Sequence, residues 1–272
     1  MSRSNCQKTD GKYRTAGEGP HDLRPLPGRD AGSAGALSGA FRKCLFLLLT
    51  AAFLAGCNKE KPAGPDQAPD SDAMSRFYYD DSSYQGVALE RKTIGEVRFP
   101  SGGIIAADPF YIAEDFTFPF ARRIVPGRYP VSLCYADIKD WGRRVAFARI
   151  DFSAERPSEW VGAALAGGDP SESAYGVDAG LGSFVDESLK DAFADEIANF
   201  DNQKPGGNFY VEVLEKEFHD DGSWAIHDIA NSDGQIVIFE SGLGDGAYES
   251  YWGMKDGRVI SLVTDFGIFS DD

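Results

Sequence analysis

Apolar and polar residues alternate along several short segments from about residue 76 onward, and this period of two is typical of β-strands. In VSLCYA, the alternation places Val131, Leu133 and Tyr135 on one face of a strand and Cys134 on the opposite face. Glycine, proline or aspartate bounds most of these segments, as is common at strand ends. The pattern predicts strands over residues 104–107, 129–136, 145–152 and 209–214.

Two segments indicate helices instead. The stronger covers residues 187–200, where the apolar residues follow one another at steps of four, four and three, namely Leu189, Phe193, Ile197 and Phe200. Asp186 precedes this stripe and is the expected N-cap. The weaker segment opens at Pro157, because PSEW combines a proline with an early acid, as helix starts often do.

Four Asp-Gly pairs divide the C-terminal third of the chain, at steps of 12, 12 and 11 residues beginning at Asp221. Asp-Gly favours two-residue hairpin turns, because both central positions of such a turn take positive φ. We therefore expect an antiparallel meander, in which SGLGDG, residues 241–246, is a hairpin turn widened by extra glycines. The expected fold class is α+β, mainly antiparallel sheet with one or two packed helices.

An uncharged apolar run at residues 44–56 follows Arg42 and Lys43. It has 13 residues, which is short of the roughly 20 that a helix needs to span a membrane. Basic residues on one flank only argue against a buried amphipathic helix and indicate a signal peptide over residues 36–56. The run ends in Leu-Ala-Gly-Cys, which resembles the bacterial lipobox, and this resemblance implies that Cys57 is lipidated. The alternative is cleavage for soluble export.

The regions beside this signal complete the expected organisation. Residues 1–35 are polar and rich in glycine, proline and arginine, which is typical of a disordered extension. The alternative is a wrongly assigned start codon, in which case translation begins near Leu37 and these residues are not made. Residues 57–75 read as a flexible tether and residues 76–272 as one globular domain. The lipoprotein resemblance, with Asn58 after the cysteine, implies anchoring in the cell envelope, in the outer membrane facing the periplasm.

Charge narrows the range of partners. After Cys57 the chain carries 19 basic and 39 acidic residues, so nucleic acid and anionic lipid headgroups should be repelled. From residue 157 onward there are five basic residues against 24 acidic ones. This imbalance indicates either an ordinary solvated surface or a face for a cation or a basic protein.

Named catalytic and cofactor motifs fail on their context. SGLGDG lacks the Gly-Lys-Ser/Thr of a phosphate-binding loop and the following helix of a dinucleotide fingerprint. Cys134 sits inside a strand pattern, and the spacing of His219 and His227 fits no zinc motif. The sequence therefore predicts no catalytic residue and no cofactor.

What remains is a group of polar residues in glycine-rich contexts. If the aspartates converge, they could bind a divalent cation or act as an acid/base pair; if they do not, they cap helices and stabilise turns. The metal, if any, is left open. Asp186 belongs to the same group, and the candidate binding residues are Asp108, Asp178, Ser241, Asp245, Tyr248 and Asp265.

Several segments together resemble DUF4241, a bacterial domain family of unknown function. They are IIAADPF, PGRYPV, RRVAFARIDF, YGVDAGLGSFVD and, most specifically, IVIFESGLGDGAYESYWGMKDGRVISLVTDF. The resemblance covers roughly residues 104–266 and implies one domain, without assigning catalytic residues. The sequence thus favours a non-enzymatic binding or interaction module on the envelope, with a hydrolase that uses clustered aspartates as the alternative.

Overall fold

The computed structural model describes residues 70–169 and 172–269, all within one compact unit, Lys61–Asp272. The predicted signal peptide, Cys57 and most of the expected tether lie outside the described residues. The strands are β1 (Ser83–Tyr84), β2 (Val87–Phe99), β3 (Ile104–Ala107), β4 (Gly127–Ile138), β5 (Gly142–Asp151), β6 (Glu159–Gly162), β7 (Ala174–Val177), β8 (Leu181–Asp186), β9 (Trp224–Asp228), β10 (Gln235–Glu240), β11 (Gly246–Lys255) and β12 (Arg258–Asp265). The helical segments are α2 (Ser71–Ser75), η1 (Arg76–Asp80), η2 (Pro109–Tyr111), η3 (Glu187–Leu189), α3 (Lys190–Gln203), α4 (Phe209–Glu212), η4 (Leu214–Glu217) and η5 (Asp220–Gly222).

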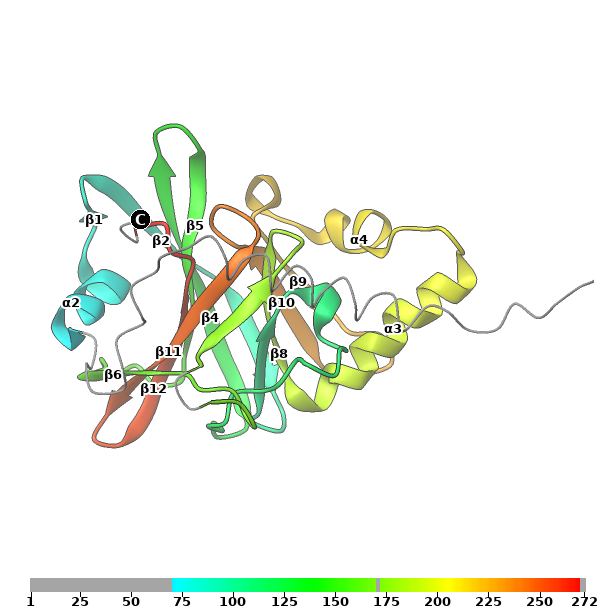
Figure 1. Ribbon diagram of the computed structural model, residues 1–272, viewed down its shortest axis with the longest axis horizontal. Helices are drawn as coiled ribbons and strands as arrows, with labels where there is room; N and C mark the ends of the chain where they lie inside the picture. The colour runs from blue at the N-terminus through cyan, green and yellow to red at the C-terminus, as the bar shows by residue number, and fades with distance from the viewer. Residues whose placement is uncertain (1–69, 170–171, 270–272) are drawn as a thin grey trace, which may run out of the picture. The chain divides into compact units, whose positions relative to one another are not determined.

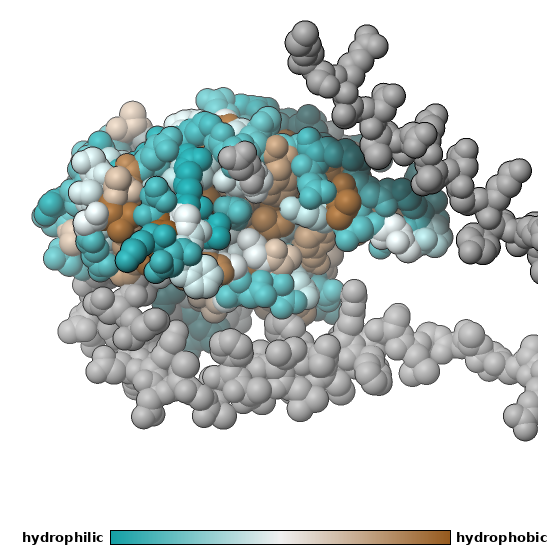
Figure 2. Space-filling model, turned by 90° about the horizontal axis from the view of Figure 1, so that it is seen from above, coloured by the Kyte–Doolittle hydropathy of each residue, from teal (hydrophilic) through white to brown (hydrophobic). Residues whose placement is uncertain are grey.

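Two antiparallel sheets form the centre of this unit (Figure 1). The large sheet has the strand order β1-β2-β4-β5-β12-β11-β6, and β7 also pairs with β11. The small sheet has the order β3-β8-β10-β9. The expected α+β class, dominated by antiparallel sheet, is confirmed. The face of the molecule drawn in Figure 2 is mostly hydrophilic, with small hydrophobic patches.

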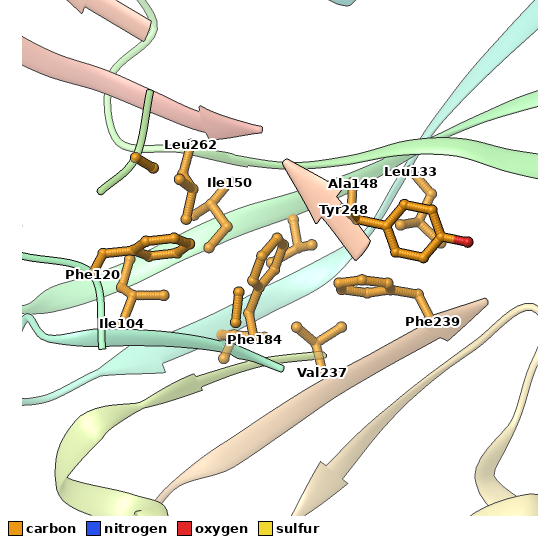
Figure 3. Packing of buried hydrophobic residues seen from close by; sticks show 14 of the residues in the cluster. Ile104, Phe120, Leu133, Ala148, Ile150, Phe184, Val237, Phe239, Tyr248 and Leu262 are labelled. Atoms are coloured by element: carbon orange, nitrogen blue, oxygen red, sulfur yellow. The ribbon is translucent and has the colours of Figure 1, made fainter. Parts of the chain in front are cut away.

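The main core lies between the two sheets (Figure 3). Leu133, Ile150 and Leu262 of the large sheet face Phe184, Val237 and Phe239 of the small sheet, and all six are fully buried. Truncation of a large side chain in such a core costs about 3–5 kcal/mol. This packing fixes the relative positions of the two sheets and therefore of the loops that leave their strand ends.

The alternation predicted for β4 is confirmed. Val131, Leu133 and Tyr135 belong to the core between the sheets, whereas Cys134 belongs to a separate cluster on the outer face of the large sheet. Both faces of this strand are therefore covered, and its central residues are buried.

Helix α2 and η1, residues 71–80, which we call the N-terminal segment, cover the outer face of the large sheet. Arg91 and Arg149 donate hydrogen bonds to the backbone carbonyl of Tyr78, and the indole nitrogen of Trp160 donates to Ser75 Oγ at 2.9 Å. Helix α2 thus lies in residues that the sequence assigned to the tether, and the described fold begins at its N-cap, Asp70.

Helices cover the other face of the small sheet. The stripe predicted for residues 187–200 is confirmed: Leu189 and Phe193 are buried and the rest of the stripe is partly buried against the same cluster. The predicted cap is confirmed too, since Asp186 Oδ1 accepts the backbone N–H of Ser188 at 2.8 Å.

Two predicted elements are wrong. The segment after Pro157 is strand β6, not a helix, because its backbone pairs with β11 and the fully buried Trp160 fits under the N-terminal segment. Residues 209–214 are helical, not extended: the side chain of Asn208 accepts the N–H of Val211 at 3.2 Å and caps α4. In the first case tertiary contacts override the local pattern, and in the second a helix cap three residues away does so.

The predicted C-terminal meander is divided between the sheets. Strands β9 and β10 form a hairpin in the small sheet, and β11 and β12 form one in the large sheet. The turn at Asp256 and Gly257 has φ of 49° and 72°, as a two-residue hairpin turn requires. Since β10 does not pair with β11, residues 241–245 are a crossing between the two sheets, and the predicted glycine-widened hairpin is wrong.

Candidate functional site

Asp108 is the centre of the candidate site. It directly follows β3, caps η2 through Oδ1, which accepts the N–H of Phe110 at 2.9 Å, and is fully buried. Its Oδ2 accepts two further N–H groups, from Asp178 at 3.0 Å and from Ala179 at 2.7 Å. Burial raises the pKa of this carboxyl above its ordinary value, against the opposite influence of the three N–H donors. One carboxylate thus joins the end of β3 to the turn between β7 and β8, which we call the 178–180 turn.

The crossing segment holds the same turn from the other side. Asp245 Oδ1 accepts the N–H of Gly180 at 3.0 Å, and the N–H of Ser241 donates to the Gly180 carbonyl at 3.1 Å. The Tyr248 hydroxyl donates to the carbonyls of Ser241 and Gly244, at 2.9 and 2.6 Å. The structure therefore brings five of the six predicted residues together around one turn, namely Asp108, Asp178, Ser241, Asp245 and Tyr248.

The crossing needs its glycines for backbone reasons. Gly242 has φ of 62° and Gly244 has φ of 113°, a region that side chains other than glycine rarely adopt. A Cβ at Gly242 would also lie 2.8 Å from Cβ of Phe266. The glycines thus serve a tight passage between the sheets.

Asp178 differs from Asp108 in its surroundings. Its side chain is exposed, as is that of Asp245, and it accepts the hydroxyl of Tyr111 at 2.9 Å. Its carboxylate faces solvent, whereas that of Asp108 is enclosed. Asp178 therefore supplies charge at the surface of the site.

Asp265 does not join this group. Its Oδ2 accepts the hydroxyl of Tyr78 at 2.9 Å and its Oδ1 accepts the N–H of Gly267 at 2.9 Å, beneath the N-terminal segment. Burial raises its pKa above the ordinary value. It fixes the N-terminal segment to the end of β12.

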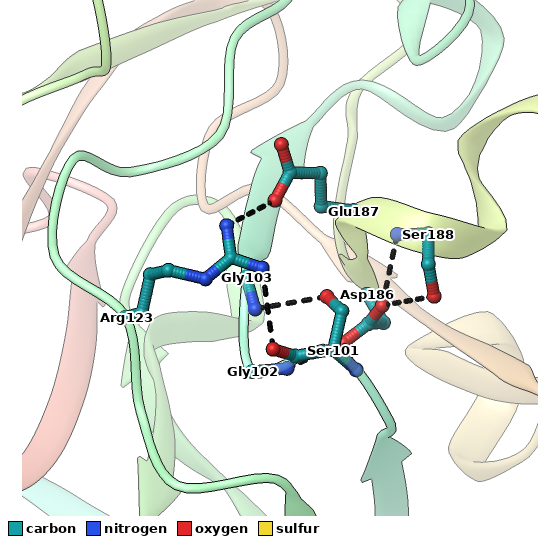
Figure 4. Close-up of polar contacts among 7 residues, drawn as sticks. All are labelled: Ser101, Gly102, Gly103, Arg123, Asp186, Glu187 and Ser188. Atoms are coloured by element: carbon teal, nitrogen blue, oxygen red, sulfur yellow. Dashed lines mark hydrogen bonds and ion pairs between the residues drawn. The ribbon is translucent and has the colours of Figure 1, made fainter.

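Asp186 repeats the arrangement of Asp108 at the opposite end of the β3–β8 pair (Figure 4). It is fully buried, and its carboxylate accepts the N–H groups of Ser101, Gly102 and Ser188 together with the Ser188 hydroxyl. Each end of the small sheet thus has a buried aspartate that binds the backbone of a loop. This parallel favours turn stabilisation as the role of Asp108.

A pocket of ≈ 440 Å³ opens beside the 178–180 turn. Most of its lining is apolar or aromatic, and the lining residues are Phe110, Ala179, Leu181, Asn208 and Tyr210. The Asp108 carboxylate binds the backbone of two of them, Phe110 and Ala179, and so fixes two walls of the pocket. A pocket of this size with a mainly apolar lining can take one apolar side chain or a small ligand.

Other chemistry considered from the sequence finds no support in the described residues. Within them no group of three or more His, Cys, Asp or Glu side chains is placed to hold a metal ion, and no helix is long and apolar enough to cross a membrane. Cys134 is buried on the outer face of the large sheet, whereas His227 lies on β9 beneath α3. Burial raises the pKa of the Cys134 thiol to about 11, which suits a core residue rather than a nucleophile.

One polar cluster was not predicted. His227 is buried, and its two ring nitrogens lie 2.9 Å from Glu217 Oε2 and 3.0 Å from Glu196 Oε1. The other oxygen of Glu196 accepts the N–H of Ala230 at 2.9 Å. The cluster ties α3, η4 and β9 together. A signal was present in the sequence, since Glu196 lies three residues after Phe193 within the apolar stripe of the helix.

Comparison with known proteins agrees with the resemblance noted from the sequence motifs. Residues 97–264, more than half of the 272-residue chain, match the family described as "Protein of unknown function (DUF4241)". No curated protein and no solved structure matches the chain. The matched region runs from β2 into β12 and contains the whole 178–180 turn with Asp108, Ser241 and Asp245. The chain therefore belongs to the DUF4241 family.

Proposed function

We propose that this protein is a non-enzymatic binding module, anchored through lipidated Cys57 in the cell envelope, most simply in the outer membrane facing the periplasm. One observation carries the proposal of binding rather than catalysis. Both oxygens of the buried Asp108 are engaged with backbone N–H groups, so this carboxylate stabilises a turn and is not presented to a substrate. The apolar pocket beside it offers a place for contact with a partner.

The alternative is a hydrolase that uses the convergent aspartates. It draws support from the raised pKa of Asp108 next to the exposed carboxylate of Asp178, because a carboxyl with a raised pKa suits a general acid. Against it, a general acid or base must reach the proton that it transfers, and Asp108 is fully buried. The binding module is therefore the stronger proposal.

Asp178→Asn and Asp245→Asn separate the two proposals. A hydrolase should lose turnover in both variants, including Asp178→Asn, which keeps the backbone hydrogen bonds of the turn. In a binding module Asp245→Asn should lower the melting temperature, since Asp245 accepts the N–H of Gly180, and Asp178→Asn should not. A folded Asp178→Asn variant that loses a hydrolytic activity found in the wild type would refute the proposal.

The anchor is tested separately with Cys57→Ser. Cells given a labelled fatty acid should label the wild-type chain and not the variant, and wild-type protein should fractionate with the outer membrane. A matched Cys134→Ser variant should keep the label, because that thiol is buried in the folded domain. Unlabelled wild-type protein in the cytosol would refute the anchor and leave the binding proposal open.

A further inference from the structure

The pocket beside the 178–180 turn has rigid walls. Phe110 and Ala179 are both fixed by Asp108, and Leu181 begins β8 in the small sheet. Tyr210 belongs to the capped helix α4, and its ring packs edge-on against Phe110 at 6.3 Å between centroids and against Phe218 at 5.9 Å. A preformed apolar pocket loses little conformational freedom when an apolar group enters it.

Carboxylates surround this pocket. Asp178 and Asp245 are exposed at the 178–180 turn, one next to Ala179 and the other bound to the N–H of Gly180. Near Tyr210, a lining residue, the charges of Glu215 and Glu240 add to the effect of burial in raising the pKa of its phenol. Apolar walls are thus combined with a negative rim.

At one point the chain partly neutralises this rim itself, since burial raises the pKa of the Glu240 carboxyl and the charge of Arg144 opposes that rise. Basic residues are otherwise scarce in the C-terminal part of the chain. From residue 157 onward there are only five of them, and each has a partner. Lys190 donates to the carbonyls of Glu114 and Thr117, Lys204 pairs with Glu212, and Lys216 donates to the Glu212 carbonyl. The other two, Lys255 and Arg258, both pair with Glu155. At the 178–180 turn, the carboxylates of Asp178 and Asp245 accept a tyrosine hydroxyl and a backbone N–H, so their negative charge is available to a partner from outside.

We infer that the pocket receives an apolar side chain from a basic segment of a partner protein, while lysine or arginine residues beside that side chain contact the carboxylates of the rim. This inference rests on the proposed binding function and names the chemistry of the partner. Charge complementarity increases the association rate and excludes acidic segments, while the buried apolar side chain supplies most of the affinity. Nucleic acids and anionic surfaces do not fit such a rim.

Synthetic peptides test the inference with the full-length chain in detergent. The probe is a fluorescent peptide with tryptophan flanked by four lysines, compared with peptides in which alanine replaces tryptophan or glutamate replaces lysine. We expect the tryptophan-lysine peptide to bind at least about tenfold more tightly than either comparison peptide. Raising the salt from about 0.05 M to about 0.5 M should weaken binding, because screening removes the contribution of the rim.

Variants locate the binding. Ala179→Arg fills the pocket with a charged side chain and should weaken binding of the tryptophan-lysine peptide at least about tenfold. Val125→Arg makes the same charge change at an exposed position next to Ile124, whose carbonyl lies near Gly102 at the opposite end of the small sheet, and should leave binding nearly unchanged. Tyr210→Ala, which removes a pocket wall, provides a second measurement if Ala179→Arg does not fold.

The outcomes are distinct. Equal binding of the alanine-lysine and tryptophan-lysine peptides, equal weakening by Ala179→Arg and Val125→Arg, or no peptide binding would each overturn the inference. Photo-crosslinking in cells, with the crosslinker at position 125 or 179, then distinguishes failure of this inference from failure of the binding function. Capture of a partner from position 125 but not from position 179 would mean that the protein binds a partner elsewhere than at this pocket.

The binding function itself would be rejected if the wild type hydrolyses a substrate and the Asp178→Asn variant does not.

Discussion

Replacement of Asp108 by asparagine is the sharpest test of what holds the candidate site together. The carboxylate accepts three N–H groups, from Phe110, Asp178 and Ala179, at 2.7 to 3.0 Å. Asparagine keeps the size of the side chain but presents one acceptor and one donor. Whichever way the amide is turned, its NH₂ group faces at least one backbone N–H.

The magnitude follows from these contacts. If the amide oxygen keeps the pair from Asp178 and Ala179, one hydrogen bond to a charged acceptor is lost, worth about 1.5–3 kcal/mol, and two donors are left unsatisfied at about 1–3 kcal/mol. The raised pKa of Asp108 shows that burial of its charge offsets part of this loss. We expect a net destabilisation of about 2–4 kcal/mol, which corresponds to a fall in melting temperature of about 5–15 °C.

Thermal and urea unfolding followed by circular dichroism measure this change, and hydrogen exchange locates it. The amide hydrogen of Phe110 should exchange faster in Asp108→Asn if the amide oxygen keeps the pair from Asp178 and Ala179, and the amide hydrogens of that pair should exchange faster if the side chain is turned the other way. The matched control is Asp178→Asn at the exposed neighbour, which should change the free energy of unfolding by no more than about 0.5 kcal/mol. An Asp108→Asn protein as stable as the wild type, with the amides of Phe110, Asp178 and Ala179 all still protected, would refute the reasoning and reopen a catalytic role for Asp108.

Three further outcomes are expected. Cys134, with its thiol pKa raised to about 11 by burial, should resist alkylation near pH 8 in the folded chain and react once the chain is unfolded; rapid labelling of folded protein would contradict its place in the core. In Tyr78→Phe the buried Asp265 loses a donor that lowers its raised pKa, so the pKa of this carboxyl in the folded variant should lie higher still. The unfolded pKa is common to both proteins, so the stability deficit of the variant should grow as pH rises through the raised folded pKa of the wild type toward that of the variant, and a deficit independent of pH would exclude this assignment. Glu196→Ala should lower stability by about 1–3 kcal/mol by removing partners from His227 and Ala230, as measured by urea unfolding against the exposed control Asp195→Ala.

Local patterns were reliable wherever one periodicity ran unopposed. The stripe from Leu189 to Phe200, with its Asp186 cap, and the alternation along β4 both appear in the structure as the sequence predicts. They succeed because a helix or a strand that buries one face must repeat its apolar residues with its own period. The turn at Asp256 and Gly257 succeeds because positive φ at two successive positions strongly favours such residues.

The same reasoning failed where distant parts of the chain supply the deciding contact. PSEW reads as a helix start, but β11 pairs with this segment and the N-terminal segment covers Trp160. FYVEVL reads as a strand, but the Asn208 cap and the covered face of the small sheet make it helical. SGLGDG reads as a hairpin turn, yet its two flanking strands belong to different sheets.

The sequence alone determined the class of the fold, the family and the residue types available at the site, because these depend on periodicity and local motif. The prediction of a lipobox at Cys57 also comes from the sequence and lies outside the described residues. Only the tertiary structure decided which aspartates meet, since Asp108, Asp178 and Asp245 come from three distant segments that the two sheets bring to one turn. A hydrogen bond between residues about 70 positions apart depends on how the sheets pack, and neighbouring residues in the chain do not encode that geometry.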